Sequence, residues 1–144
     1  MSPNPIITIR HLNYAFGKGE LRKPVLFDVD LDIYPGEIVI MTGPSGSGKT
    51  TLLTLIGGLR SVQSGSVKIL GQELYGASKH ELVKVRNQIG FIFQSHNLLA
   101  CLTVEQNVRM SLRLHEDIAF EQRDMMTTTI LEAVGLGDRL NFYP

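Results

Sequence analysis

Residues 38–59 read IVIMTGPSGSGKTTLLTLIGGL, and the expected class of fold follows from this segment. It opens with a nearly continuous apolar run at 38–42, which predicts a strand of a parallel sheet that is buried on both faces. A glycine-rich loop follows at 43–48, and residues 49–59 predict a helix that ends at or just beyond its paired glycines. The sequence therefore predicts a strand, a tight loop and a helix in immediate succession.

The loop and the start of the helix, GPSGSGKT (43–50), match the pattern G-x-x-x-x-G-K-[ST] at every defined position. Glycines let a backbone wrap closely around a cluster of oxygens and turn several N–H groups inward. The positive end of the helix dipole points at the same place. The pattern therefore predicts a P-loop that binds the phosphates of a nucleoside triphosphate.

Each residue of this predicted site has an expected role. We expect the Lys49 ammonium to lie between the β- and γ-phosphates, and the Thr50 hydroxyl to ligate a Mg²⁺ ion that bridges them. The N–H or hydroxyl group of Thr51 is expected at the α-phosphate. The nucleotide-binding residues predicted from loop and helix are Gly43, Pro44, Ser45, Gly46, Ser47, Gly48, Lys49, Thr50 and Thr51. Kinases, GTPases and motor ATPases all share a P-loop, so the loop alone names no reaction.

Two segments before the P-loop, residues 6–12 and 25–33, have the composition of strands. In the second segment apolar residues alternate with polar ones, which predicts an antiparallel strand with one solvated face. We interpret Asp28, Asp30 and Asp32 as that solvated face rather than as a metal site.

Downstream of the P-loop, sequence patterns predict three helix starts. The tetrapeptides S-K-H-E from Ser78 and T-V-E-Q from Thr103 are capping boxes, which predict helices over about 79–87 and 104–114. Asp117 is the expected cap of a last helix, which stops before the next glycine.

The order of these elements indicates the fold class. Residues 67–70 predict a short strand and residues 89–93 (IGFIF) a second buried strand. Together with the strand before the P-loop, they predict an α/β fold with a parallel core sheet, an antiparallel β annex and the start of a helical subdomain. The annex and P-loop core are expected over about 1–94, and the helical part over about 95–144.

The composition limits the classes of function. The 14 basic residues balance the 14 acidic ones, so the broad basic field that nucleic-acid binding requires is missing. The N-terminal MSPNPIITIR lacks an apolar signal-peptide core, and the longest apolar runs, about five residues, fall short of the roughly 20 that span a bilayer. We expect no nucleic-acid partner and no direct membrane insertion, and any membrane link should run through a partner protein.

Cysteine and histidine usage adds little to the functional prediction. The single cysteine, Cys101, cannot form an internal disulfide, and no basic neighbour in sequence activates it. His11, His80 and His115 lack the spacing of a metal site, so a zinc site is not expected.

The stretch IYPGEIVIMTGPSGSGKTTLLTLIGGL (33–59) strongly resembles the ATP-binding cassette (ABC) family. The segments S-G-S-V at 64–67, I-F-Q at 92–94 and N-L-L at 97–99 fit the same family. Within it, the chain is similar to the ATPases of the lipoprotein-releasing and macrolide-exporting branch. The run LIGGLRSVQSGSVKILGQEL (55–74), with HLN and GKGELRK near the start, resembles DevA-type ATPase subunits of glycolipid exporters.

The resemblance implies roles for residues outside the P-loop. In this family an aromatic residue upstream of the P-loop stacks on adenine. Phe16 occupies that position, with Tyr14 as the alternative. Gln94 matches the glutamine of the Q-loop, whose side-chain oxygen reaches Mg²⁺ or the attacking water. The implied catalytic residues are therefore Lys49 and Gln94, and the implied metal ligands are Thr50 and Gln94.

The resemblance also implies a function and partners. The parent protein is expected to be the ATP-hydrolysing subunit of an ABC exporter that uses ATP and Mg²⁺. It is expected to pair with a second nucleotide-binding subunit and a transmembrane permease subunit, at the cytoplasmic face of the plasma membrane. His96 is expected near the permease and not beside the γ-phosphate.

The family's later motifs do not follow the P-loop. The sequence holds no L-S-G-G-Q signature and no apolar run ending in Asp-Glu, so we expect a partial nucleotide-binding domain, truncated before the signature. Two alternatives stay open: a nucleotide-binding fragment without turnover, and another soluble P-loop enzyme such as a kinase or a DNA-repair ATPase. The balanced charge, Phe16 and the position of Gln94 count against the second.

Overall fold

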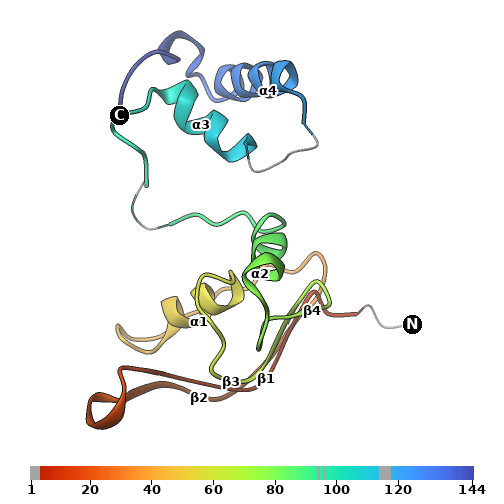
Figure 1. Cartoon of the computed structure of the whole chain (residues 1–144), viewed down its shortest axis with the longest axis vertical. Helices are drawn as coiled ribbons and strands as arrows, with labels where there is room; N and C mark the ends of the chain where they lie inside the picture. The colour runs from red at the N-terminus through yellow and green to blue at the C-terminus, as the bar shows by residue number, and fades with distance from the viewer. Residues whose placement is uncertain (1–3, 94, 96, 114–117) are drawn as a thin grey trace. The chain divides into compact units, whose positions relative to one another are not determined.

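The chain divides into two units, Met1–Phe91 and Ile92–Pro144 (Figure 1). The structure, a computed structural model, describes residues 4–93, 95, 97–113 and 118–144. The first unit contains β1 (Ile7–Phe16), β2 (Lys23–Ile33), α1 (Lys49–Ile56), β3 (Ser64–Ile69), β4 (Gln72–Glu73) and α2 (Lys79–Arg86). The second unit contains α3 (Val104–Leu112) and α4 (Phe120–Ala133).

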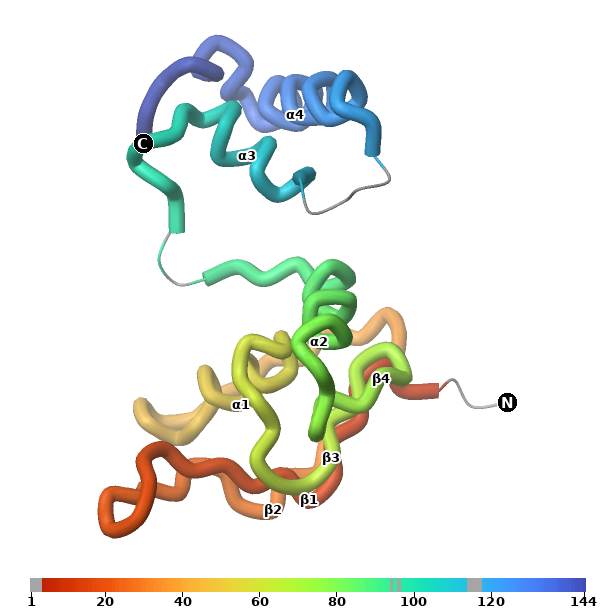
Figure 2. Tube along the Cα trace, viewed as in Figure 1, coloured from red at the N-terminus to blue at the C-terminus, as the bar shows by residue number. Residues whose placement is uncertain are grey.

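The first unit is built on an antiparallel sheet with the strand order β2-β1-β3-β4. The trace shows the chain running out along β1, back along β2, and later returning through β3 beside β1 (Figure 2). Helices α1 and α2 lie over the sheet, and their apolar side chains share one core with it. Ile9, Leu12, Leu55 and Val67 are fully buried there. Burial of a side chain such as Leu55 contributes about 2 kcal/mol, and it holds the P-loop helix against β1 and β3.

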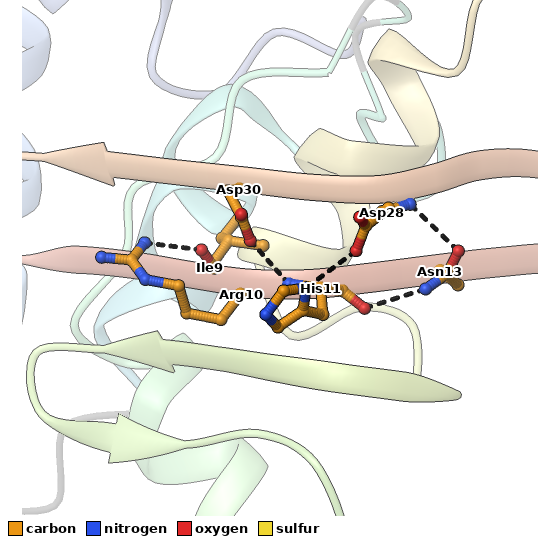
Figure 3. Close-up of polar contacts among 6 residues, drawn as sticks. All are labelled: Ile9, Arg10, His11, Asn13, Asp28 and Asp30. Carbon is orange, nitrogen blue, oxygen red and sulfur yellow. Dashed lines mark hydrogen bonds and ion pairs between the residues drawn. The ribbon is translucent and has the colours of Figure 1, made fainter.

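β1 and β2 each contain a β-bulge, and the two bulges lie opposite each other (Figure 3). The register between the strands shifts by one residue between Ile9 and Leu12, and shifts back between Leu12 and Tyr14. His11 and Asp28 have left-handed backbone conformations, with φ of 50° and 45°. Because each strand accommodates one extra residue, the pairing at Tyr14 has the same register as at Ile9, and a further shift of one residue follows between Tyr14 and Ala15.

Polar contacts connect the two bulges (Figure 3). His11 Nδ1 lies 2.9 Å from Asp28 Oδ1, and the His11 N–H group donates to Asp30 Oδ1 at 2.7 Å. The Asp28 N–H group donates to Asn13 Oδ1 at 3.0 Å, and Asn13 Nδ2 donates to the His11 carbonyl at 2.9 Å. These side chains satisfy backbone groups that a regular ladder would have paired.

The two predicted parallel strands do not form in the described part of the chain. Residues 38–42 and 89–93 have no strand conformation, and the side chains of Ile38 and Ile92 are 94% and 98% exposed. A parallel strand buried on both faces needs neighbouring strands for its backbone and apolar cover for its side chains. The described sheet contains β1 to β4 only, so these segments lack both. The prediction of two buried strands was therefore wrong for this structure.

The two capping boxes are confirmed. The Ser78 hydroxyl accepts from the Glu81 N–H group while the Glu81 side chain accepts from the Ser78 N–H group, and Thr103 and Gln106 repeat this exchange at α3. The predicted cap of the last helix was wrong, because α4 has Ala119 as its N-cap and no side-chain hydrogen bond there. Asp117 lies outside the described residues.

The second unit is a pair of helices closed by the C-terminal segment. The N–H groups of Val104 and Glu105 donate to the carbonyls of Phe142 and Leu140 at 2.8 and 3.0 Å. Arg109 of α3 pairs with Glu105 and, from Nε at 3.1 Å, with Asp124 of α4. Within the described residues no helix has the length and apolar character to cross a membrane.

Candidate nucleotide-binding site

Helix α1 begins without a side-chain cap, unlike α2 and α3. Its N-cap is Gly48, with φ 91° and ψ 0°. The N–H groups of the first helical turn have no partner within a helix, and here no capping side chain accepts from them. The start of α1 therefore presents N–H donors and the positive end of its dipole to a ligand.

Gly48 must be glycine at this position. Its backbone lies in the left-handed region, and a Cβ atom placed there would lie 2.8 Å from Leu26 Cδ2. Leu26 belongs to the buried core, so the neighbour has little room to move. The loop is thereby packed directly onto β2.

The side chain of Lys49 turns back over the loop. Its Nζ donates to the carbonyls of Gly43 and Pro44, each at 2.7 Å, and to Ser47 Oγ at 3.1 Å. A Cβ atom on Gly43 would lie 3.1 Å from Ser47 Oγ and 3.8 Å from Nζ, so glycine there leaves space beside the ammonium. The loop thus holds a cation within a shell of small residues.

A cavity of about 490 Å³ opens over the loop and the helix start. Predicted site residues make up most of its lining, and none of the lining residues is acidic. The lining residues are Phe16, Lys23, Val25, Ser45, Gly46, Ser47, Gly48, Lys49, Thr50 and Thr51. Two ammonium groups, several hydroxyl groups and the helix N-terminus suit a polyanion.

The structure brings together all of the predicted P-loop residues and adds two that sequence reasoning missed. Gly43 and Pro44 contact Lys49 rather than the main cavity. Lys23 and Val25 lie on β2, which reaches the cavity because it pairs with β1, where Lys23 lies opposite Phe16. They were missed because this pairing is not visible in the local sequence. Nothing in the local sequence around Lys23 indicates this role.

The two candidate aromatic residues have different surroundings. Phe16 lines the cavity with 37% of its surface exposed, whereas Tyr14 packs against the hydrophobic core. Their rings meet edge to face with centroids 5.2 Å apart. The geometry favours Phe16 as the base-stacking residue, and that role stays a prediction.

Four residues named from the sequence, His115 and Asp117 among them, lie outside the described part of the chain, and two of these have predicted roles in function. They are Gln94, the predicted Q-loop glutamine and metal ligand, and His96. Their predicted roles therefore stay predictions.

The polar contacts among His11, Asn13, Asp28 and Asp30 form a separate cluster on the β1–β2 pair. A hydrogen bond to Asp28, and then the negative charge of Asp30, raise the pKa of His11 above its usual value. The side chains of His11 and Asp28 are 75% and 73% exposed. Asp32 pairs with Arg10 at 2.6 Å, and this hydrogen bond lowers the pKa of Asp32. Among the described residues no group of three or more His, Cys, Asp or Glu side chains is placed to hold a metal ion.

Comparisons with known proteins agree with this geometry. The chain is 39% identical over its full length to the macrolide export ATP-binding/permease protein MacB of Marinobacter nauticus, and covers 22% of that protein. It is 39% identical over 96% of its length to the lipoprotein-releasing system ATP-binding protein LolD 2 of Rhodospirillum rubrum, and covers 60% of it. The chain thus spans between about a fifth and three fifths of these relatives.

Solved structures show the same fold. The dimeric ATP-binding cassette MJ0796 bound to ADP and Pi superposes with a TM-score of 0.84 at 32% identity, covering 96% of this chain and 61% of that one. This likeness confirms the fold class predicted from the sequence, an α/β P-loop NTPase of ABC type. The relatives confirm the predicted branch, that of lipoprotein release and macrolide export. The glycolipid-exporter subgroup stays a prediction. The family model of the ABC transporter matches residues 26–143, and the chain belongs to the ATP-binding domains of the ABC transporter family.

Proposed function

We propose that the chain binds Mg-ATP as part of the ATPase of an ABC exporter. The observation that carries this proposal is the start of α1, where uncapped N–H groups and the Lys49 ammonium meet in a cavity without acidic lining. On binding, the phosphates replace the Gly43 and Pro44 carbonyls as partners of Lys49. A charge-assisted bond to phosphate is stronger than one to a neutral carbonyl, which favours the exchange.

The same cavity suits the magnesium ion that accompanies the nucleotide. Mg²⁺ prefers oxygen ligands and is usually held by few protein groups together with phosphates and water. Thr50 supplies a hydroxyl oxygen from the cavity wall beside Lys49. We propose that Thr50 is a magnesium ligand and that Gln94 is a second one.

The proposal extends to partners and location. One relative is named as an ATP-binding/permease protein, and the solved cassette is dimeric. We propose that the whole protein works with a transmembrane permease and a second nucleotide-binding subunit, at the cytoplasmic face of the plasma membrane. The transported substrate is then chosen by the permease.

Isothermal titration of the chain with ATP in the presence of Mg²⁺ tests the proposal. Lys49→Ala should weaken ATP binding at least tenfold, about 1.4 kcal/mol, because the variant loses the ammonium between the phosphates. Lys68→Ala, which removes an exposed lysine of β3 outside the cavity, is the matched control and should bind like wild type. Equal affinity of wild type and Lys49→Ala would contradict the proposal.

Binding without turnover is the second candidate for this chain by itself. The described cavity lining contains no carboxylate that could orient a water molecule, and positioning of water is what hydrolysis adds to binding. We expect no phosphate release above that of Lys49→Ala, and turnover by the whole protein. Release that depends on Lys49 would show that the chain supplies its own base, with Asp28, Asp30 and Asp32 as the first residues to test.

A further inference from the structure

The end of β1 is held by the loop that follows the P-loop helix. Gln63 of this loop donates from Nε2 to the Ala15 carbonyl at 2.9 Å and accepts from the Ala15 N–H group at 3.0 Å. A side-chain amide thus replaces a strand partner for the residue directly before Phe16. The backbone that carries Phe16 is therefore fixed from the C-terminal side of α1.

Arg60 of the same loop holds the ring of Phe16. Its guanidinium carbon lies 5.0 Å from the ring centroid, within the range of a cation–π contact. Arg60 is absent from the described lining of the cavity, whereas Phe16 lines it. The guanidinium thus contacts a ring that lines the cavity, although Arg60 itself is not part of that lining.

Arg60 is in turn oriented by α1 and β1. Its Nε donates to Thr54 Oγ1 at 3.2 Å, and its backbone N–H group donates to the Thr54 carbonyl at 3.2 Å. Its Nη1 reaches the Tyr14 hydroxyl at 3.5 Å. One side chain therefore connects the helix that begins at Lys49 with the aromatic pair at the end of β1.

We propose that Arg60 is a positioning residue for nucleotide binding, whose contact fixes the Phe16 ring so that the ring accepts the base of the nucleotide. This inference rests on the proposed function. The ring's rotamer is restricted before the ligand arrives, so less side-chain freedom is lost on stacking. The adjacent positive charge also leaves the ring face less electron-rich toward the base.

Two ligands distinguish the contribution of the base to binding from that of the phosphates. They are ATP and inorganic tripolyphosphate, which has the phosphate chain alone. Arg60→Met keeps an unbranched side chain and removes the charge. It should weaken ATP binding by up to about two- to fivefold, because the free energy of an exposed cation–π contact limits how strongly Arg60 can restrict the ring, and it should leave tripolyphosphate binding unchanged. Arg60→Lys should recover most of the lost affinity. Arg10→Met removes the same charge from β1 and is the control, expected to bind both ligands like wild type.

A double-mutant cycle tests the connection to Phe16. Phe16→Ala with Arg60→Met should bind ATP no more weakly than Phe16→Ala alone, because Arg60 acts through the ring. Unchanged ATP binding by Arg60→Met, equal losses for both ligands, or additive losses in the double variant would overturn the role of Arg60. If the wild type did not bind tripolyphosphate, the proposed function itself would be overturned. Unchanged ATP binding by Phe16→Ala would reject the base-stacking residue and leave the phosphate site intact.

Discussion

Gly48 packs against Leu26 so closely that a Cβ atom at Gly48 would lie 2.8 Å from Leu26 Cδ2. The residue that gives the P-loop its left-handed turn is thus also the residue that lets the loop rest on the core. A chain conformation and a packing contact both depend on the absence of one methyl group.

Gly48→Ala should therefore lower the free energy of unfolding more than an alanine at another left-handed glycine. Gly71 has φ of 82°, and the place where its Cβ atom would lie is open space, so Gly71→Ala reports backbone strain alone. We expect Gly48→Ala to cost about 1–3 kcal/mol beyond Gly71→Ala, the usual range for overpacking a core. Urea denaturation of both variants measures the difference. Equal losses would mean that Leu26 moves aside freely.

Phe16 and Tyr14 should respond differently to alanine substitution. Tyr14 packs against the core, and Phe16 is partly exposed in the cavity wall. Phe16→Ala should weaken ATP binding with little change in melting temperature, whereas Tyr14→Ala should lower the melting temperature. Because stacking on an aromatic face tolerates any base, GTP should compete measurably with ATP. A larger loss of ATP affinity in folded Tyr14→Ala would reverse the assignment.

The pKa of His11 should lie above the usual value of about 6.5, because Asp28 accepts its hydrogen bond and Asp30 adds negative charge. The raised pKa of the folded protein means that charged His11 stabilises the fold below pH 6.5, and that this contribution disappears as the pH rises through the raised pKa. An NMR titration of the His11 ring measures the midpoint. Asp28→Asn should lower it, and Glu132→Gln, on a separate unit of the chain, should leave it unchanged. A midpoint at or below 6.5 in wild type would contradict the geometry.

The capping box at Ser78 should contribute to the stability of the first unit. Ser78→Ala removes the acceptor of the Glu81 N–H group, and loss of an N-cap typically costs about 1 kcal/mol. Ser61→Ala, at an exposed loop position, is the matched control. Thermal unfolding followed by circular dichroism compares the two. Equal melting temperatures would show that water replaces the cap without cost.

The parts of the site that depend on local sequence could be predicted, and the parts that depend on distant residues could not. The P-loop is a local pattern, because glycine spacing and the following helix are enough to shape it. The contact of Arg60 with Phe16 is not visible in the sequence, since it requires β1 and the end of α1 to come together. Lys23 reaches the cavity for a similar reason, through strand pairing.

The fold shows the same division. Capping boxes at Ser78 and Thr103 were predicted correctly because each satisfies its own helix terminus. The buried strands at 38–42 and 89–93 were predicted from their own apolar composition, although a strand exists only where a neighbour pairs with it. The alternation read in 25–33 also breaks, because the bulge at Asp28 leaves Leu26 buried and Phe27 exposed.

The opposed bulges have a consequence for how the length of this strand pair can change during evolution. In a regular strand, residues three positions apart point to opposite faces, yet Ile9 and Leu12 are both fully buried. The extra residue at His11 makes this possible, and loss of that residue would leave Ile9 and Leu12 two positions apart and still facing inward. Deletion of one residue is therefore tolerated at the bulge without inverting the strand, whereas the same change within 7–9, where the pairing is regular, would turn core side chains toward water.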